Sequence, residues 1–307
     1  MTTMLPTFLV TGGARCGTTY LFELLRQNHH LFLNEPRTRE SITKDTYFFS
    51  HRCYKNNSIN IHDYEKHFIN AKPGQKIGEV ATSYDFFPWV PSLIHKYLTP
   101  KIRLIFLVRN PIQRAYSHYM LSLVRDNELY SFETAINKEA ERLVDTDPNY
   151  LYNLHVYSYT ARGFYMKNID NYLIYFPKEQ IKIISSESLY ADSRQVYREI
   201  CDFLEIDEVA INFQRERNKL PLPKDITYYR LLKFIKAATS GKPMIWRLSK
   251  LIKKLIADMP KNIGSSYPPI NPSVIQILSQ LYKSDLQRLS SFLGLDFFDL
   301  WNIKNAL

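Results

Sequence analysis

The chain has 307 residues, of which 45% are hydrophobic and 23% are charged. This composition is that of a globular protein with a sizeable core, and it excludes disordered, collagen-like and other low-complexity classes. Forty lysines and arginines against thirty acidic residues give a net charge of +10. A basic chain favours anionic partners: nucleotides, phosphate or sulfate esters, nucleic acid or an acidic membrane surface.

The cysteine content and the N-terminal sequence indicate the cellular compartment. Three widely spaced cysteines, Cys16, Cys53 and Cys201, exclude a disulfide framework or a zinc cluster and favour a reducing environment. We find no apolar run near the roughly 18 residues that span a bilayer and no basic leader at the start of the chain. The sequence therefore predicts a cytoplasmic protein, with peripheral contact to the inner membrane face as an option.

Short apolar strands alternate with helical patterns along the chain. Strands are predicted at 7–11, 77–80, 102–108 and 181–184. Helices are predicted at 18–27, from 111 onward, and at 131–144, 161–176, 192–204 and 273–293. This alternation predicts an α/β fold of three layers, a central mainly parallel sheet flanked by helices, in a single domain over 1–307.

The first predicted strand is followed by a loop suited to anions. Gly12, four residues, Gly17, Thr18 and Thr19 have the spacing of a nucleotide P-loop, but Thr18 stands where such a loop has its lysine. Arg15 is the fixed cation inside the loop. Because a helix N-terminus presents free N–H groups, the pattern predicts an anion site that is poorly equipped for Mg²⁺ and a triphosphate.

A second cationic element follows the most apolar strand. Arg109 stands at the predicted strand tip, where open α/β sheets place ligands, and Pro111 opens the next helix. Ser117 lies eight residues beyond Arg109, so that a guanidinium and a hydroxyl could clamp a phosphate monoester. Arg114, one turn before Ser117, is either a neighbour of this clamp or a surface charge.

A basic segment at about 224–260 stands apart from the rest. Residues 224–261 hold ten lysines and arginines against two aspartates, interleaved with apolar residues, and 240–243 divide them into two helices. Three interpretations stay open: a solvated basic face, a cap that attracts an anionic substrate, or a surface that docks on acidic lipid.

Together, the two anion elements resemble the sulfotransferases that use 3′-phosphoadenosine 5′-phosphosulfate (PAPS). Residues 10–19 look like that family's 5′-phosphosulfate loop, and residues 109–117 look like its 3′-phosphate element. Other stretches resemble the heparan-sulfate and bacterial carbohydrate branch: 78–79, 163–165, 181–184, 187–189 and 281–301. The resemblance implies a P-loop-like fold, PAPS as co-substrate, 3′,5′-ADP as product and no metal. The resemblance extends over the whole chain except the basic segment.

The resemblance assigns roles to the residues of the first loop. It implies that Arg15 neutralises the sulfuryl and bridging oxygens as charge develops on the leaving phosphate. Cys16, Gly17, Thr18 and Thr19 would supply N–H and hydroxyl donors to the same group.

The 3′-phosphate would be held by two further elements. The resemblance places Arg109 and Ser117 on this phosphate. It also matches residues 261–268 to a second 3′-phosphate loop, from which Lys261, Gly264 and Ser265 are carried over.

The resemblance also implies a catalytic base. In this branch a glutamate shortly before a Phe-Phe pair takes the acceptor proton, and residues 44–49 of this chain read Lys-Asp-Thr-Tyr-Phe-Phe. Asp45 occupies the glutamate position, with Lys44 as its cationic neighbour. A helix cap or solvated acid is the structural alternative for Asp45. Other nearby candidates for the base are His51, Glu40, Glu35, His29 and His30.

The sequence thus predicts a PAPS-dependent sulfotransferase that acts on a hydroxyl of a carbohydrate, glycolipid or small metabolite. One alternative is a P-loop kinase of small molecules, against which Thr18 argues. A second is a non-catalytic, peripheral nucleotide-binding protein. Nucleic-acid binding is not expected, because no recognition motif accompanies the basic segment.

Overall fold

The computed structural model describes residues 4–34, 44–54, 59–125, 127–214, 222–239, 246–259, 261–262 and 267–303. The chain forms two compact units. The first comprises residues 1–114, 162–216 and 279–307, and the second comprises residues 115–161 and 217–278. Among the described residues, no helix has the length and apolar character needed to cross a membrane.

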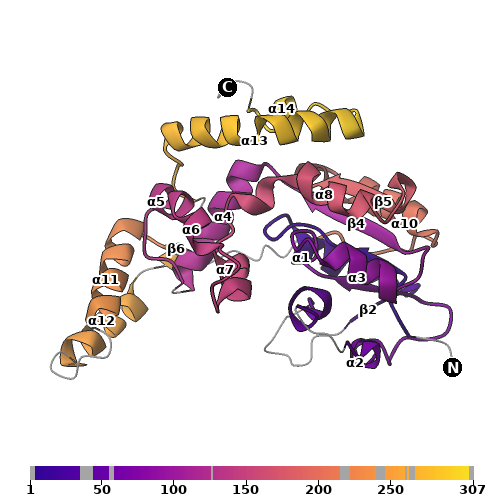
Figure 1. The fold of residues 1–307 in the computed structure, drawn as a ribbon, viewed down its shortest axis with the longest axis horizontal. Helices are drawn as coiled ribbons and strands as arrows, with labels where there is room; N and C mark the ends of the chain where they lie inside the picture. The colour runs from indigo at the N-terminus through magenta and orange to yellow at the C-terminus, as the bar shows by residue number, and fades with distance from the viewer. Residues whose placement is uncertain are drawn as a thin grey trace. The chain divides into compact units, whose positions relative to one another are not determined.

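The first unit is built on a sheet of five parallel strands (Figure 1). β1 (Phe8–Val10) lies between β3 (Lys76–Val80) and β4 (Arg103–Val108). β2 (Leu31–Leu33) is the edge strand beside β3, and β5 (Ile181–Ser185) is the edge strand beside β4. Because every pairing is parallel, all five strands end at the same edge of the sheet.

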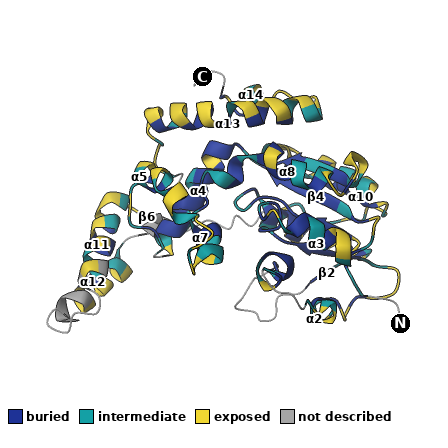
Figure 2. Cartoon of the chain, in the orientation of Figure 1, coloured by how far each residue is buried: buried dark blue, intermediate teal, exposed yellow. Residues whose placement is uncertain are grey.

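One face of the sheet is covered by α1 (Thr18–Leu25), α9 (Ser186–Ala191) and α10 (Ser193–Leu204). Their apolar side chains form one buried cluster with Phe8 and Val10 of the central strand. Alternate residues of a strand point to opposite faces, so the intervening strand residues are buried against a second layer. The dark central strands in Figure 2 reflect this two-sided burial.

The opposite face of the sheet carries α8 (Tyr165–Leu173) and α3 (Val90–Tyr97). The ring of Tyr172 on α8 lies 4.9 Å from that of Phe106 on β4, measured between centroids. From residue 279 onward, α13 (Pro272–Leu293) packs on α8, where Asp285 accepts from the first-turn N–H groups of that helix. The remaining short elements are η1 (Phe48–Arg52), α2 (Ile61–Glu65), η2 (Ala161–Gly163), η3 (Lys178–Gln180) and α14 (Phe297–Leu300).

The second unit is mainly helical. It contains the part of α4 (Pro111–Val124) from residue 115 onward, and the antiparallel helices α11 (Ile226–Thr239) and α12 (Trp246–Asp258), which pack on each other. Its other elements are α5 (Phe132–Asn137), α6 (Glu139–Arg142), α7 (Tyr150–Val156), and the two-residue strands β6 (Leu222–Pro223) and β7 (Lys261–Asn262), which pair antiparallel.

The predicted three-layer α/β fold is confirmed, and each of the four predicted strands is present. The sequence did not predict β2, whose three residues are too few to show a period. The pattern at 131–144 forms two short helices rather than one, because the helix is interrupted at Lys138. The predicted pair of basic helices corresponds to α11 and α12. The single-domain assignment stays a prediction.

Candidate active site

The carboxyl edge of the sheet brings together the segments that the sequence singled out. The loop after β1, the residues after β3 and the residues after β4 all leave the sheet at this edge. Register places Val10 beside Val80 and Ile105, so these three exits are adjacent. Ligands of open parallel sheets bind at this edge.

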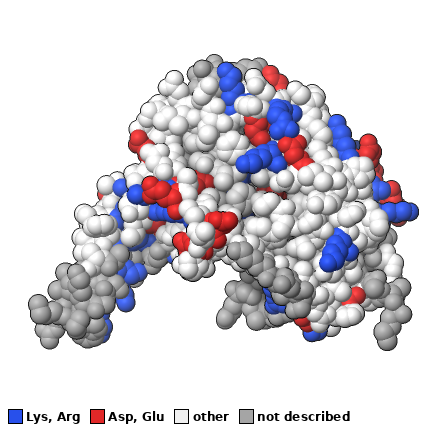
Figure 3. Space-filling model, in the orientation of Figure 1, with Lys and Arg blue, Asp and Glu red and all other residues white. Residues whose placement is uncertain are grey.

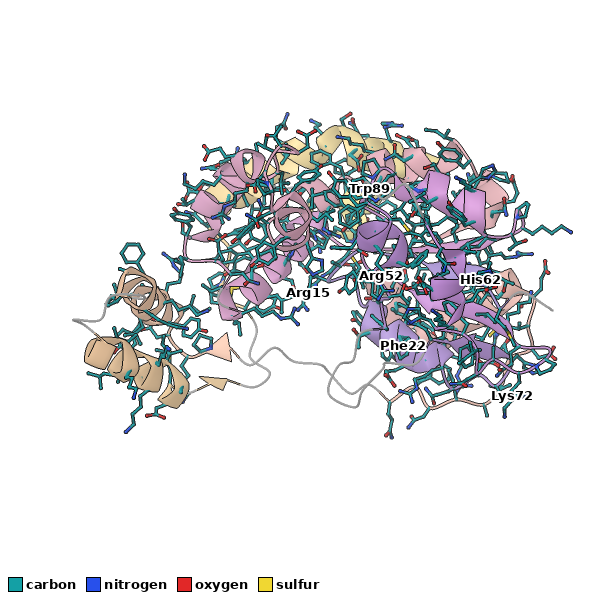
Figure 4. The ribbon with its side chains drawn as sticks, turned by 60° about the horizontal axis from the view of Figure 1, so that its bottom comes forward. Arg15, Phe22, Arg52, His62, Lys72 and Trp89 are labelled. Carbon is teal, nitrogen blue, oxygen red and sulfur yellow. The ribbon has the colours of Figure 1, made fainter. Side chains whose placement is uncertain are left out.

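The loop after β1 is shaped by close backbone approach and by two left-handed residues. A Cβ on Gly12 would lie 2.2 Å from the backbone nitrogen of Leu107, so only glycine fits beside β4. Arg15 has φ 75° and Gly17 has φ 95°. These angles turn the chain into α1, whose first-turn N–H groups have no acceptor within the helix. Arg15 (labelled in Figure 4) is half-buried on this turn.

Cys16 closes the loop from the inside. Its N–H donates to the Gly13 carbonyl at 3.0 Å, and its buried sulfur lies 3.9 Å from the Tyr165 hydroxyl. Burial raises the pKa of the Cys16 thiol to about 12, so the thiol stays protonated. The Cys16 N–H is thus engaged within the loop, and donation to the phosphosulfate by Cys16, Gly17, Thr18 and Thr19 stays a prediction.

The second cationic element lies directly against the first loop. The Arg109 guanidinium donates to the Arg15 carbonyl at 3.1 Å. Tyr165 fixes the backbone there, since its hydroxyl donates to the Arg109 carbonyl at 2.7 Å. Arg114 is fully buried and donates to the Ala14 carbonyl at 3.4 Å, so the surface-charge alternative for Arg114 is wrong. Arg109 and Arg114 thus border the loop that contains Arg15.

Asp45 is a buried carboxylate rather than a solvated loop acid. One oxygen accepts from the Tyr47 N–H at 2.8 Å, and the other accepts from the hydroxyls of Thr82 at 3.2 Å and Ser83 at 3.1 Å. Burial raises the pKa of Asp45, and these donors offset only part of that rise. A carboxylate with a raised pKa is a stronger base than a solvated one.

Lys44 connects this carboxylate segment to the phosphate loop. Its Nζ donates to the Thr19 hydroxyl at 3.2 Å, in the first turn of α1. Burial lowers the pKa of Lys44 to about 7, while the charges of Asp45 and Glu23 act in the opposite direction. The position that carries lysine in an ordinary P-loop is Thr18, and here a lysine from another segment reaches the neighbouring hydroxyl.

Sequence reasoning did not assign roles to two buried carboxylates near Asp45. Glu79, inside β3, accepts from the Thr46 N–H at 2.7 Å and from the Tyr64 hydroxyl at 2.6 Å. Burial and the charge of Asp45 raise the pKa of Glu79 to about 7. An acidic residue within an apolar strand is the sequence signal that could have identified it.

The second of these carboxylates is Asp85, whose Oδ1 lies 3.9 Å from the guanidinium of Arg162, and both side chains are buried. Burial raises the pKa of Asp85 to about 7, and the Arg162 charge opposes that rise. Nothing in the spacing of these two residues indicates that they meet.

The second unit contains the other half of the predicted 3′-phosphate element. The buried Ser117 hydroxyl lies 3.0 Å from the Tyr267 hydroxyl, so α4 and the end of the predicted second 3′-phosphate loop are in contact. Lys261 lies in β7, paired with β6. Gly264 and Ser265 lie outside the described residues, as do two candidates for the base, Glu35 and Glu40.

The histidine candidates for the base are less suitable than Asp45. Burial and the nearby charge of Arg162 lower the pKa of His51 to about 4, so it is a weak base. His29 and His30 immediately precede β2. Since β2 is parallel to the other strands, these two histidines lie at the amino edge of the sheet, opposite the loop.

The second unit also has a cavity of about 500 Å³. It lies beside α4, α5 and the start of α11, and its walls combine aromatic rings with Arg230 and Lys224. Pro268, the last residue of the predicted second 3′-phosphate loop, lines it, whereas no residue of the loop after β1 does. Its lining residues are Tyr116, Tyr119, Ser131, Phe132, Glu133, Lys224, Asp225, Ile226, Thr227, Arg230, Pro268, Pro269, Ile270, Asn271 and Val274.

Fold and site together define an α/β protein with a P-loop-like turn after β1, in which Thr18 stands at the position of the P-loop lysine. The family model described as "Sulfotransferase domain" matches residues 5–219. The chain therefore belongs to the sulfotransferase family, whose members transfer a sulfuryl group.

Similar proteins fall in the same family. Heparan sulfate glucosamine 3-O-sulfotransferase 6 of Mus musculus is 27% identical over 295 residues, which cover 95% of this chain and 73% of that protein. The membrane-associated sulfotransferase kil1 of Dictyostelium discoideum is 24% identical, over 73% of this chain and 62% of its own length. A solved sulfotransferase from Alicyclobacillus acidocaldarius has the same fold, with a TM-score of 0.67, 21% identity, and coverage of 97% of this chain and 99% of that one.

Proposed function

We propose that this sulfotransferase takes its sulfuryl group from PAPS and transfers it to a hydroxyl of a carbohydrate. The carbohydrate class is supported by the similarity to heparan sulfate 3-O-sulfotransferases. PAPS is supported by the loop, whose cation is Arg15 and whose lysine position is occupied by Thr18. Such a P-loop-like turn suits a phosphosulfate, which has no metal-bound triphosphate tail. The cytoplasmic location stays a prediction.

The observation that carries this proposal is the contact between the two anion elements. The Arg109 guanidinium lies 3.1 Å from the Arg15 carbonyl, so the Arg109 side chain lies against the turn that contains Arg15. A nucleotide with one anionic group at each end of its ribose requires two such cations close together. ATP has its charges on a single tail and would leave the Arg109 side unused.

The proposed reaction is an in-line displacement at sulfur. The acceptor oxygen forms a bond to sulfur while the bond from sulfur to the 5′-phosphate oxygen breaks, and 3′,5′-ADP leaves with that electron pair. Asp45 takes the proton of the acceptor hydroxyl. Arg15, Lys44 and the first turn of α1 stabilise the negative charge that develops on the leaving phosphate.

A binding titration tests the proposal. Calorimetry with 3′,5′-ADP, 5′-AMP and ATP should show the tightest binding for 3′,5′-ADP. In Arg109→Ala, the affinity for 3′,5′-ADP should fall about 10- to 100-fold, since a charge-assisted hydrogen bond is lost, whereas 5′-AMP should change by less than about twofold. Arg125→Ala, at an exposed arginine, is the matched control. Equal affinities for 3′,5′-ADP and 5′-AMP in the unaltered protein would contradict the proposal.

Transfer itself is measured with sulfur-labelled PAPS and a panel of oligosaccharides that contain glucosamine. Sulfation of a sugar hydroxyl, lost in Asp45→Asn, is the expected result. The protein could instead bind 3′,5′-ADP and sulfate a phenol or a steroid alcohol but no sugar. That result would support PAPS as the donor and refute the carbohydrate as the acceptor.

A further inference from the structure

The second unit carries two basic helical segments, the described residues 224–239 and 246–259, called here the basic hairpin, which expose large apolar side chains. On α11, Leu231 and Phe234 are 54% and 59% exposed. On α12, Leu251 and Leu255 are 54% and 42% exposed. Single exposed leucines are ordinary, but four large apolar side chains exposed on two adjoining helices indicate a surface that contacts something other than water.

The orientation of α11 is set by contacts on its inner face. Tyr229, Leu232 and Lys233 are buried, and the Lys233 ammonium donates to the Leu123 carbonyl in the last turn of α4. At 100° per residue, Leu231 lies on the side of the helix opposite Lys233. The exposed apolar residues of α11 are therefore directed outward by anchored neighbours.

Exposed lysines flank the exposed leucines of α12. Lys250, Lys253 and Lys254 are exposed on α12, and Lys250 and Lys254 precede Leu251 and Leu255 in successive turns. Residues 224–261 contain only two acidic residues against ten basic ones. Figure 3 shows lysine and arginine atoms beside uncharged ones on this part of the second unit.

The combination of leucines, a phenylalanine and lysines discriminates between possible partners. An anionic polysaccharide would satisfy the lysines but would leave the leucines and Phe234 in water. A second copy of the hairpin would cover the apolar residues but would bring like charges together. An acidic lipid surface satisfies both, since aromatic and aliphatic side chains enter the interface while lysines meet anionic headgroups.

We propose that the basic hairpin docks this enzyme peripherally on membranes that contain acidic lipid. Leu231, Phe234, Leu251 and Leu255 enter the headgroup region, and Lys250, Lys253 and Lys254 contact the lipid phosphates or carboxylates. The residues of this surface belong to the second unit and none of them is a predicted site residue, so the proposal does not depend on which acceptor the enzyme uses.

Vesicle co-sedimentation tests the docking surface. The full chain is mixed with phosphatidylcholine vesicles, with and without about one-third phosphatidylserine, at low and at physiological salt. We expect sedimentation with the acidic vesicles only, weakened by salt. A protein that stays in the supernatant with acidic vesicles at low salt would overturn the proposal.

Two sets of variants separate charge from apolar insertion. Lys250→Gln, Lys253→Gln and Lys254→Gln together should lower vesicle affinity about 100-fold, at roughly fivefold per lysine. The matched control changes the exposed Lys72, Lys96 and Lys101 to glutamine and should leave vesicle affinity within about threefold.

The apolar pair Leu231→Ser and Phe234→Ser should lower vesicle affinity at least about tenfold. Its matched control is Ile69→Ser with Ile174→Ser, at side chains that are 65% and 73% exposed in the first unit. Every variant is first checked for 3′,5′-ADP binding equal to that of the unaltered protein. A loss of vesicle binding can then be distinguished from a loss of the fold, and it is judged independently of the proposed sulfotransferase reaction.

One further outcome would overturn the apolar insertion, and another would overturn the lipid assignment. If the serine pair binds acidic vesicles as tightly as the unaltered protein while the lysine variant does not, the hairpin is a purely electrostatic polyanion surface. If sedimentation equilibrium shows a dimer that the serine pair abolishes, and acidic vesicles fail to bind, the occupant is a second copy of the chain.

Discussion

The lowered pKa of Lys44 predicts that donor binding is coupled to proton uptake. The free enzyme holds this lysine with a pKa of about 7, against a usual value of 10.5. A bound phosphosulfate or 5′-phosphate near Thr19 favours the ammonium form and restores the higher pKa. Above about pH 7, binding must therefore draw a proton from solution, and the affinity for 3′,5′-ADP should fall about tenfold per pH unit, or about 100-fold by about pH 9.

Calorimetry in two buffers of different ionisation enthalpy measures this proton directly. The unaltered protein should take up about one proton at about pH 8. Lys44→Gln should bind weakly with no uptake, and Lys44→Arg, whose guanidinium stays charged, should bind tightly with no uptake. The phosphates of 3′,5′-ADP are already ionised in this range and do not produce the signal.

Two buried carboxyls titrate in the same range and need their own controls. The pKa values of Glu79 and Asp85 are both raised to about 7. Glu79→Gln and Asp85→Asn should each retain the proton uptake on 3′,5′-ADP binding. If Lys44→Gln keeps the same uptake and the same slope with pH, the lysine is not the group responsible and its proposed place at the donor is refuted.

Three other predictions concern the base, the buried acid and the tight turn. Asp45→Asn should lower the single-turnover rate by about 100- to 10,000-fold at saturating PAPS, because it removes the proton acceptor but keeps an oxygen for the Tyr47 N–H; an unchanged rate would exclude Asp45 as the base. Because the folded pKa of Glu79 is raised from 4.5 to about 7, its contribution to stability is complete below about pH 4.5 and is lost as the pH rises through 7. Urea unfolding should therefore show Glu79→Gln gaining about 3 kcal/mol relative to the unaltered protein between about pH 4.5 and pH 7, and a difference independent of pH would contradict the raised pKa. Gly12→Ala should lower the free energy of unfolding by about 3 kcal/mol, because its Cβ would lie 2.2 Å from the Leu107 nitrogen. The matched control Gly74→Ala, where no atom lies within 4 Å but φ is +87°, should cost only about 1 kcal/mol, and similar losses in both variants would argue against the close contact.

The sheet was predictable where a strand carries its own signal. The run 102–108 is almost continuously apolar, and β4 forms over Arg103–Val108. β2 has three residues and pairs only with β3, so its existence depends on a neighbour 45 residues away rather than on its own pattern. Local periodicity cannot report such a contact.

The same distinction between local and long-range signals applies to the candidate site. Arg15 and Arg109 were predictable, since each follows a strand within a few residues and all strands end at one edge. The reach of Lys44 to Thr19 joins residues 25 apart in the chain, and the Asp85–Arg162 pair joins residues 77 apart. Such contacts depend on how loops fold back across the sheet, which no spacing rule describes.

The turn at Asp45 links catalysis to local folding. The carboxylate proposed to take the acceptor proton also holds the Tyr47 amide, and Tyr47 has a left-handed φ of 54°. A glutamate here carries one more methylene and would move its oxygens away from that amide, so the shorter acid matches this turn. When the carboxylate is protonated during turnover, its hold on the amide weakens, and the peptide at Tyr47 should loosen once per cycle.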